Sequence, residues 1–165
     1  MPIKVGDKLP DATFTTMTAE GPKPMTTAEV FGGKKVALFA VPGAYTPTCH
    51  KAHMPGFVSR AVELKAKGFD TIACTAANDI FVLSAWSKDT GADGKIVMLA
   101  DGSADFAKKI GLEIDLTARG MGVRSQRYAM AVENGVVKVL NIEDAPGKAE
   151  VSSAETLCSM IDKSL

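Results

Sequence analysis

The hydrophobic positions of this chain fall into short runs separated by turn residues and by amphipathic stretches. The clearest run, residues 35–41 (KVALFAV), is followed at once by Pro42-Gly43, and it predicts a strand buried on both faces of a sheet. Shorter β-rich runs predict further strands over residues 13–17, 71–76 and 96–100. The strand over 35–41 is therefore the best candidate for the centre of the sheet.

Turn signals divide these runs. Residues 20–22 (EGP) predict a turn soon after the first strand. Later in the chain, the apolar runs 128–132 and 136–140 flank Asn134-Gly135, a pair whose residues both tolerate positive φ. This pattern predicts an antiparallel hairpin, which beside parallel strands makes the sheet mixed.

Residues that can cap helices stand between the strands. Thr26-x-x-Glu29 resembles a capping box that opens a short helix, and Gly32-Gly33 would stop that helix. Further helix starts are predicted at the potential caps Thr48, Asn78, Ser103 and Ser152.

The helix predicted after Thr48 carries Cys49, and Pro55 must kink or restart it before Gly68 ends it. Its apolar stripe consists of Phe57, Val58, Ala61, Val62 and Leu64. Strands and helices thus alternate, and no internal repeat or composition shift marks a second unit. We expect one α/β domain over residues 1–165, a three-layer sandwich around a mixed central sheet.

Composition narrows the class of function. Of the 165 residues, 46% are hydrophobic and 23% charged, the balance of a soluble globular protein. Nineteen basic and nineteen acidic residues cancel, so no basic field exists to recruit nucleic acid. The longest apolar run is too short for a membrane helix, and the N-terminus lacks an export pattern. We expect a cytoplasmic protein that binds neither nucleic acid nor membrane.

The three cysteines, Cys49, Cys74 and Cys158, are odd in number and widely spaced. They do not form the pattern of a secreted disulfide framework, which favours a reducing compartment. A cysteine in such a protein is more often a buried small hydrophobe than a catalyst. Each thiol therefore has to be judged by its own surroundings.

The segment PGAYTPTC (residues 42–49) joins the buried strand to the first turn of a helix. Unpaired backbone N–H groups and the positive end of the helix dipole favour a thiolate at Cys49. Thr46 is close enough in a tight turn for its hydroxyl to reach the sulfur or an oxygen bound beside it. Pro42 and Pro47 restrict the loop and keep water from the thiolate.

At these residues the sequence resembles the peroxiredoxins, whose active-site pattern is matched by Pro42-x-x-x-Thr46-x-x-Cys49. The full string PGAYTPTC resembles the subgroup of peroxiredoxin 5 and the plant type II enzymes. The likeness continues through VPGAYTPTCHKAHMPGF, FDTIACTAANDIFVLSAW and GVRSQRYAMAVENG. It implies a thioredoxin-like fold with an N-terminal extension and a thiol peroxidase that needs no cofactor or metal.

Carried over by residue, the resemblance makes Cys49 the peroxidatic cysteine and Thr46 the partner of peroxide and thiolate. Pro42 becomes the residue that shields the thiolate. Arg127, just before the strand at 128–132, becomes the arginine that points at the sulfur. Arg124 lies close by, so the choice of Arg127 rests on alignment with the strand.

The resemblance gives less guidance on how Cys49 is restored. Cys74 matches a second cysteine of plant type II enzymes and is a possible resolving cysteine, although a buried packing thiol is the default interpretation. Cys158 is expected to pack in the final helix. The resolving cysteine of the mammalian enzyme aligns near Ser152, so recycling by an external thiol, from glutathione with glutaredoxin or from thioredoxin, is favoured.

His50 and His53 follow Cys49 closely and invite a metal-site interpretation, but three ligands are too few for a closed zinc site. Structural or pocket-lining roles are favoured. His53 matches a histidine of the subgroup, whereas His50 usually is a small polar residue there. By resemblance, Tyr45 and Phe81 would lie near a homodimer interface.

The sequence therefore predicts an enzyme that reduces hydrogen peroxide and small organic hydroperoxides through a sulfenic acid at Cys49. Two alternatives stay open at this point. A thioredoxin-like disulfide oxidoreductase would carry a second cysteine at position 52, where the chain has Ala52. A non-enzymatic redox sensor or binding module, switched by oxidation of Cys49, would share the same pocket.

Overall fold

A computed structural model describes residues 2–145 and 147–164 of the chain. Its strands are β1 (Thr13–Thr18), β2 (Gly21–Thr26), β3 (Lys35–Ala40), β4 (Thr71–Ala76), β5 (Val97–Ala100), β6 (Glu113–Asp115), β7 (Val123–Ser125), β8 (Tyr128–Glu133) and β9 (Val136–Ile142). Its α-helices are α1 (Thr27–Phe31), α2 (Met54–Ser59), α3 (Ala61–Ala66), α4 (Ile80–Asp89), α5 (Asp105–Lys109) and α6 (Ala154–Ser164). A π-helical turn, η1 (Cys49–His53), precedes α2, and a 3₁₀ turn, η2 (Thr117–Arg119), lies between β6 and β7.

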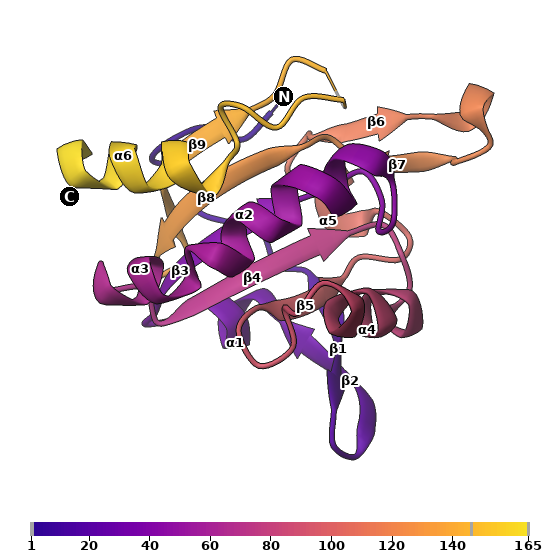
Figure 1. The fold of residues 1–165 in the computed structure, drawn as a ribbon, viewed down its shortest axis with the longest axis horizontal. Helices are drawn as coiled ribbons and strands as arrows, with labels where there is room; N and C mark the ends of the chain where they lie inside the picture. The colour runs from indigo at the N-terminus through magenta and orange to yellow at the C-terminus, as the bar shows by residue number, and fades with distance from the viewer. Residues whose placement is uncertain (1, 146, 165) are drawn as a thin grey trace.

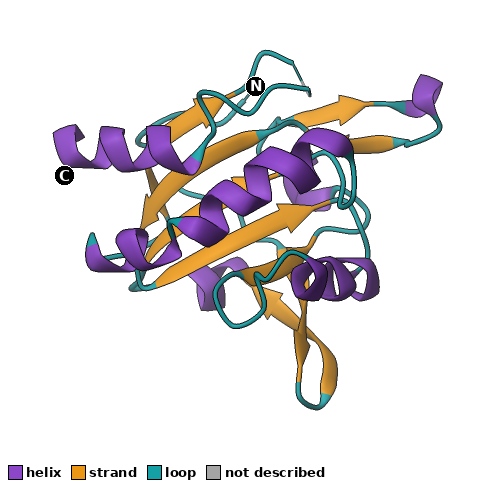
Figure 2. Cartoon of the chain, in the orientation of Figure 1, coloured by secondary structure: helices purple, strands orange, loops and turns teal. Residues whose placement is uncertain are grey.

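Seven strands form one sheet in the order β2-β1-β5-β4-β3-β8-β9, and helices cover both of its faces (Figures 1 and 2). Apolar residues of α2, α3, α4 and α6 share one buried cluster, and those of α1 and α5 share the cluster on the other face. The predicted three-layer α/β sandwich is thus confirmed. No helix in the described ranges combines the length and apolar character needed to cross a bilayer.

Strand β3 lies near the centre of the sheet, as its continuous apolar sequence predicts. It pairs parallel with β4, where Phe39 faces Cys74, and antiparallel with β8, where Ala40 faces Tyr128. The hairpin of β8 and β9 turns at Asn134 and Gly135, whose φ angles are 48° and 78°. The mixed character of the sheet follows the sequence prediction, whereas the middle place in the strand order belongs to β4, the neighbour of β3.

The edge strand β2 was not predicted, because it contains Pro22 and Pro24 where only a turn was expected. Proline cannot donate to a ladder and is tolerated at an edge. Strand β2 pairs with β1 alone, and Pro22 and Pro24 are exposed at this edge of the sheet. The three-residue strands β6 and β7 were also missed, since runs this short carry little pattern.

The sequence predicted the presence of the helices more accurately than the residues at which they begin. The capping box at Thr26 and Glu29 is confirmed by reciprocal bonds of 3.2 and 3.1 Å. The cap predicted at Asn78 is wrong, because Asp79 accepts the Val82 N–H at 2.9 Å and caps α4. The side chain of Asn78 instead accepts a hydrogen bond from the loop before Cys49.

Three other predicted caps are also wrong. Helix α5 begins after Ala104, and its first N–H groups bond to the buried carboxylate of Asp101 rather than to Ser103. Ser153, not Ser152, caps α6 by accepting the Thr156 N–H at 3.2 Å. Thr48 has helical dihedral angles, and its hydroxyl donates to the Gly147 carbonyl at 2.9 Å.

The long helix after Cys49 is divided at Arg60, whose φ and ψ are −102° and 11°. Pro55 stands in the first turn of α2 and so restarts the helix after η1, as predicted. Phe57, Ala61 and Leu64 are buried, but Val62 is 81% exposed. Its assignment to the apolar stripe was wrong, because it lies about 100° round the helix from Ala61.

Candidate active site

The loop after β3 is held by hydrogen bonds among its own residues and by bonds to other elements of the fold. Thr46 donates both its N–H, at 3.3 Å, and its hydroxyl, at 2.7 Å, to the Gly43 carbonyl. The Ala44 N–H donates to the side chain of Asn78 at 2.9 Å. Tyr45 holds a left-handed φ of 64° within this turn. The chain therefore enters the helix along one defined path.

Close packing explains the glycine of this loop. A β-carbon at Gly43 would lie 2.9 Å from Nη1 of Arg124 and 3.2 Å from Cγ2 of Thr46. Pro42, immediately before, is buried, and its carbonyl accepts from Nη1 of Arg124 at 3.2 Å. Arg124 therefore packs against this loop and stabilises it by a hydrogen bond.

Cys49 opens the π-helical turn, in which the Met54 N–H reaches back to the Cys49 carbonyl. Such wide turns are rare and are frequent at functional sites. The Cys49 side chain is completely buried in the cluster beneath α2. Only a small molecule, or a movement of the turn, can bring a reactant to its sulfur.

Arg127 reaches this sulfur from the residue that precedes β8. Its guanidinium is buried, and Nη2 donates to Sγ of Cys49 at 2.9 Å. A fixed cation at this distance favours negative charge on the sulfur. The structure thus places Arg127, rather than Arg124, at the thiol.

His53 holds the other end of this guanidinium, whereas the sequence favoured only a general structural or pocket-lining role for it. Nη1 of Arg127 lies 2.9 Å from Nδ1 of His53, and Nε2 of His53 lies 2.8 Å from the Ser152 carbonyl. Since arginine can only donate, Nδ1 is the acceptor and Nε2 carries the proton. The spacing of four residues from Cys49, on one helical face, was the available signal.

Burial, and after it the positive charge of Arg127, lower the pKa of His53 from 6.5 to about 3. The ring lies among aromatic neighbours, with its centroid 5.0 Å from that of Phe39 and 5.5 Å from that of Phe57. A neutral imidazole is therefore the form that accepts from Arg127.

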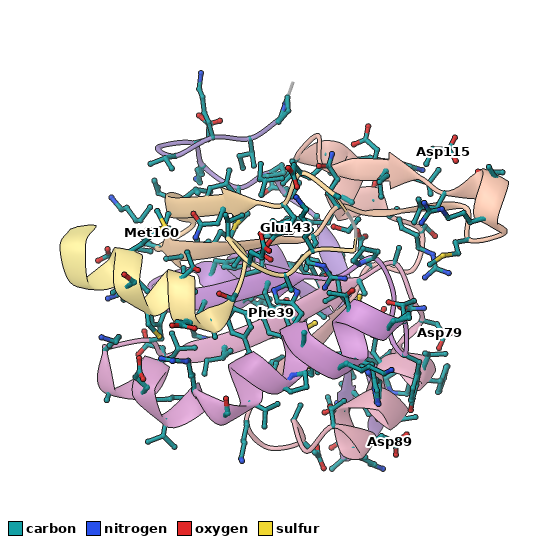
Figure 3. All side chains as sticks on the ribbon, turned by 45° about the horizontal axis from the view of Figure 1, so that its top comes forward. Phe39, Asp79, Asp89, Asp115, Glu143 and Met160 are labelled. Atoms are coloured by element: carbon teal, nitrogen blue, oxygen red, sulfur yellow. The ribbon has the colours of Figure 1, made fainter. Side chains whose placement is uncertain are left out.

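Glu143, a buried residue that directly follows β9, fixes the Ser152 segment to which His53 is bonded. Its Oε2 accepts from the N–H groups of Glu150 and Ser152 at 2.7 Å and from the Ser152 hydroxyl at 2.6 Å. The Glu143 N–H donates to the Arg127 carbonyl at 3.0 Å. In Figure 3, Glu143 and Phe39 lie near the middle of the molecule, whereas Asp115 lies toward one end.

The other two cysteines, Cys74 and Cys158, are buried and form no disulfide. Burial raises the pKa of Cys74 well above its usual range, and the charge of Cys49 raises it further while Arg127 lowers it. Burial and a hydrogen bond to Glu63 raise the pKa of Cys158 to about 11. Both thiols are therefore protonated at neutral pH.

The aromatic residues near the loop differ in burial. Trp86 is fully buried, whereas Phe81 is 65% exposed and Tyr45 is also exposed. His50 is half-buried and contacts Trp86 and Tyr45. Within the described residues, no group of three or more His, Cys, Asp or Glu side chains is arranged to hold a metal ion.

Comparison with known proteins identifies the family of this chain. The model of the Redoxin family matches residues 4–158. Peroxiredoxin-2E, a chloroplastic protein of Arabidopsis thaliana, is 50% identical over 159 residues, which cover 94% of this chain and 68% of the relative.

Solved structures agree equally well. The reduced Prx3 of Vibrio vulnificus, in complex with H₂O₂, superimposes with a TM-score of 0.91 at 52% identity, covering 96% of this chain and 99% of the other. Peroxiredoxin 5 of Alvinella pompejana gives a TM-score of 0.85 at 33% identity, covering 98% and 99%. The fold is therefore the thioredoxin-like fold of these enzymes. With a family match over nearly its whole length, the chain belongs to the redoxin family and is a peroxiredoxin of the atypical, type II kind, a thiol peroxidase.

Proposed function

We propose that Cys49 is the peroxidatic nucleophile of this thiol peroxidase. The observation that carries the proposal is the 2.9 Å contact from Nη2 of Arg127 to a completely buried sulfur. The thiolate attacks one peroxide oxygen, the S–O bond forms and the O–O bond breaks. The leaving oxygen takes a proton and departs as water or an alcohol. Sulfur is oxidised to a sulfenic acid and the peroxide is reduced.

Arg127 stabilises the charge as it moves from sulfur to the leaving oxygen, because its cation is held in place before the reaction begins. Thr46 has a narrower role. Its hydroxyl proton is already donated to the Gly43 carbonyl, so the free lone pairs of its oxygen accept from a peroxide O–H. Pro42, buried beside the turn, keeps water from the thiolate.

The substrates are hydrogen peroxide and small organic hydroperoxides. Full burial of Cys49 supports this size limit, because a bulky hydroperoxide could not approach the sulfur while the turn is folded. The similar protein of Vibrio vulnificus was solved with H₂O₂, which supports the same substrate class.

An external thiol, from glutathione with glutaredoxin or from thioredoxin, returns Cys49 to the thiol. The burial of Cys74 supports this route, because a protonated and buried thiol is a weak nucleophile. Cys74 is the alternative resolving residue, and it could act only after the Cys49 turn has moved.

The enzyme works as a homodimer in the cytoplasm. The exposed aromatic side chains of Tyr45 and Phe81, beside the active-site loop, support an interface at this face. Three free cysteines support a reducing compartment.

Stopped-flow oxidation of the reduced protein by hydrogen peroxide tests the proposal. Cys49→Ser should abolish rapid oxidation, whereas Cys158→Ser, the matched control, should react at the wild-type rate. Oxidation of the wild type no faster than that of free cysteine would exclude Cys49 as a peroxidatic residue.

Turnover assays with each reducing system identify the reductant. Cys74→Ser should keep the wild-type rate with glutaredoxin and glutathione and with thioredoxin and its reductase. A large loss with either system would instead assign Cys74 as the resolving cysteine.

A further inference from the structure

The residue after Cys49 is tied to the only tryptophan of the chain. Trp86 lies fully buried in α4, and its Nε1–H donates to Nδ1 of His50 at 3.0 Å. Indole nitrogen can only donate, so a buried Trp86 needs an acceptor, and His50 supplies it. The bond connects the π-helical turn to a separate helix.

Tyr45 extends this contact to the other side of Cys49. Its ring stacks on that of His50, with centroids 5.6 Å apart and planes inclined by 25°. Its hydroxyl donates to Asp89 of α4 at 2.6 Å, and its φ of 64° is a conformation that only surrounding contacts maintain. The loop before Cys49 and the turn after it are thus both held to α4.

The proposed reaction cycle requires these contacts to open. A sulfenic acid on a completely buried Cys49 lies out of reach of the sulfur of an external thiol. A disulfide also needs the two Cα atoms within about 7 Å of each other, with side chains directed toward one another. The turn that contains His50 must therefore unwind before reduction, and unwinding separates His50 from Trp86.

We propose that the His50–Trp86 bond is a latch that holds the Cys49 turn folded and sets how often it opens for reduction. This inference rests on the proposed role of Cys49. In the folded turn a second hydroperoxide can oxidise the sulfenic acid to sulfinic acid and is itself reduced to water or an alcohol. In the opened turn a thiol attacks the sulfur, an S–S bond forms and water leaves, and a second thiol releases Cys49. The latch therefore sets how much of the sulfenic acid is oxidised further and how much is reduced by a thiol.

The first test measures opening without any peroxide. A maleimide too large for the folded site is added to the reduced protein, and labelling of Cys49 is followed by peptide mass spectrometry. His50→Ala should label about fivefold faster, which corresponds to ~1 kcal/mol at 1.4 kcal/mol per tenfold. His50→Asn places an acceptor oxygen where Nδ1 stands and should label close to the wild-type rate. Ser59→Ala, an exposed hydroxyl on α2, is the matched control and should not change it.

The second test follows the cycle itself. In His50→Ala, reduction of the sulfenic acid by a small thiol should be about fivefold faster and sulfinic acid should accumulate more slowly, while the peroxide step keeps its rate. Equal labelling of wild type and His50→Ala would overturn the latch. Absence of peroxide oxidation in the wild type would instead remove the proposed function, and the labelling result would still decide whether the latch exists.

Trp86→Phe provides an independent variant, because it removes the donor and retains a buried ring. It should increase labelling as His50→Ala does, and the double variant should label no faster than either single one. Additive effects would show that the two residues act separately and would contradict the latch.

Discussion

The buried imidazole of His53 makes the free energy of unfolding depend on pH, and replacing His53 removes this dependence. Its pKa is about 3 in the folded protein and 6.5 in the absence of burial. Below pH 6.5 the unfolded chain therefore binds a proton at His53 that the folded chain does not bind. Stability from this group is fully present above pH 6.5 and is lost as the pH falls toward 3.

The size of the effect follows from the two pKa values. Each pH unit within this window costs at most ~1.4 kcal/mol, so acidification from about pH 7.5 to about pH 5 costs ~2 kcal/mol at this single residue. His53→Asn removes the titration and keeps an acceptor for Nη1 of Arg127. The stability difference between wild type and His53→Asn should therefore narrow by ~2 kcal/mol on acidification.

Urea unfolding of both proteins under reducing conditions, at the two pH values, measures this change. Other acidic and basic groups titrate equally in both proteins and cancel in the comparison. Ser59→Ala should keep a constant difference from wild type. A difference for His53→Asn that stays constant within ~0.5 kcal/mol, or that widens at low pH, would refute the neutral buried imidazole.

Three further outcomes are expected. Arg127→Lys keeps the charge but loses the planar guanidinium that contacts both Cys49 and His53. The stopped-flow rate with hydrogen peroxide should therefore fall about 100-fold, and a fall below threefold would contradict the role of the guanidinium geometry. Thr46→Val should lower the same rate about tenfold or more while Thr46→Ser retains most of it, and equal rates for both would exclude the hydroxyl. Glu143→Gln weakens charge-assisted bonds to the Ser152 segment and should lower the thermal midpoint by about 2–6 °C, measured by calorimetry.

Local sequence patterns predicted most of the fold because they encode burial and turn geometry directly. In the run at 35–41 only the first residue, Lys35, is polar, and the other five residues of β3 are buried. Asn134 and Gly135 could both adopt positive φ, and the hairpin turns there. Strand β2 escaped because its prolines are acceptable only at an edge, and edge position is a property of the assembled sheet.

The helix caps show a second limit. Where two polar residues stand together before a helix, the one with a tertiary partner is unavailable for capping. Asn78 accepts from the Ala44 N–H, so Asp79 caps α4. Ser152 donates to Glu143, so Ser153 caps α6. The sequence alone could not distinguish these neighbours, because their partners lie outside the helix and its caps and are brought close only by the fold.

The same reasoning separates the two halves of the site. Pro42, Thr46 and Cys49 lie within one loop, so their association could be predicted from their spacing. Arg127 is brought to the sulfur by the sheet: β8 runs antiparallel to β3, and Tyr128 faces Ala40, so β8 begins where β3 ends. The residue just before β8 therefore emerges beside the loop that carries Cys49. Once this pairing is known, the position of Arg127 follows from strand register, and the choice over Arg124 no longer depends on resemblance.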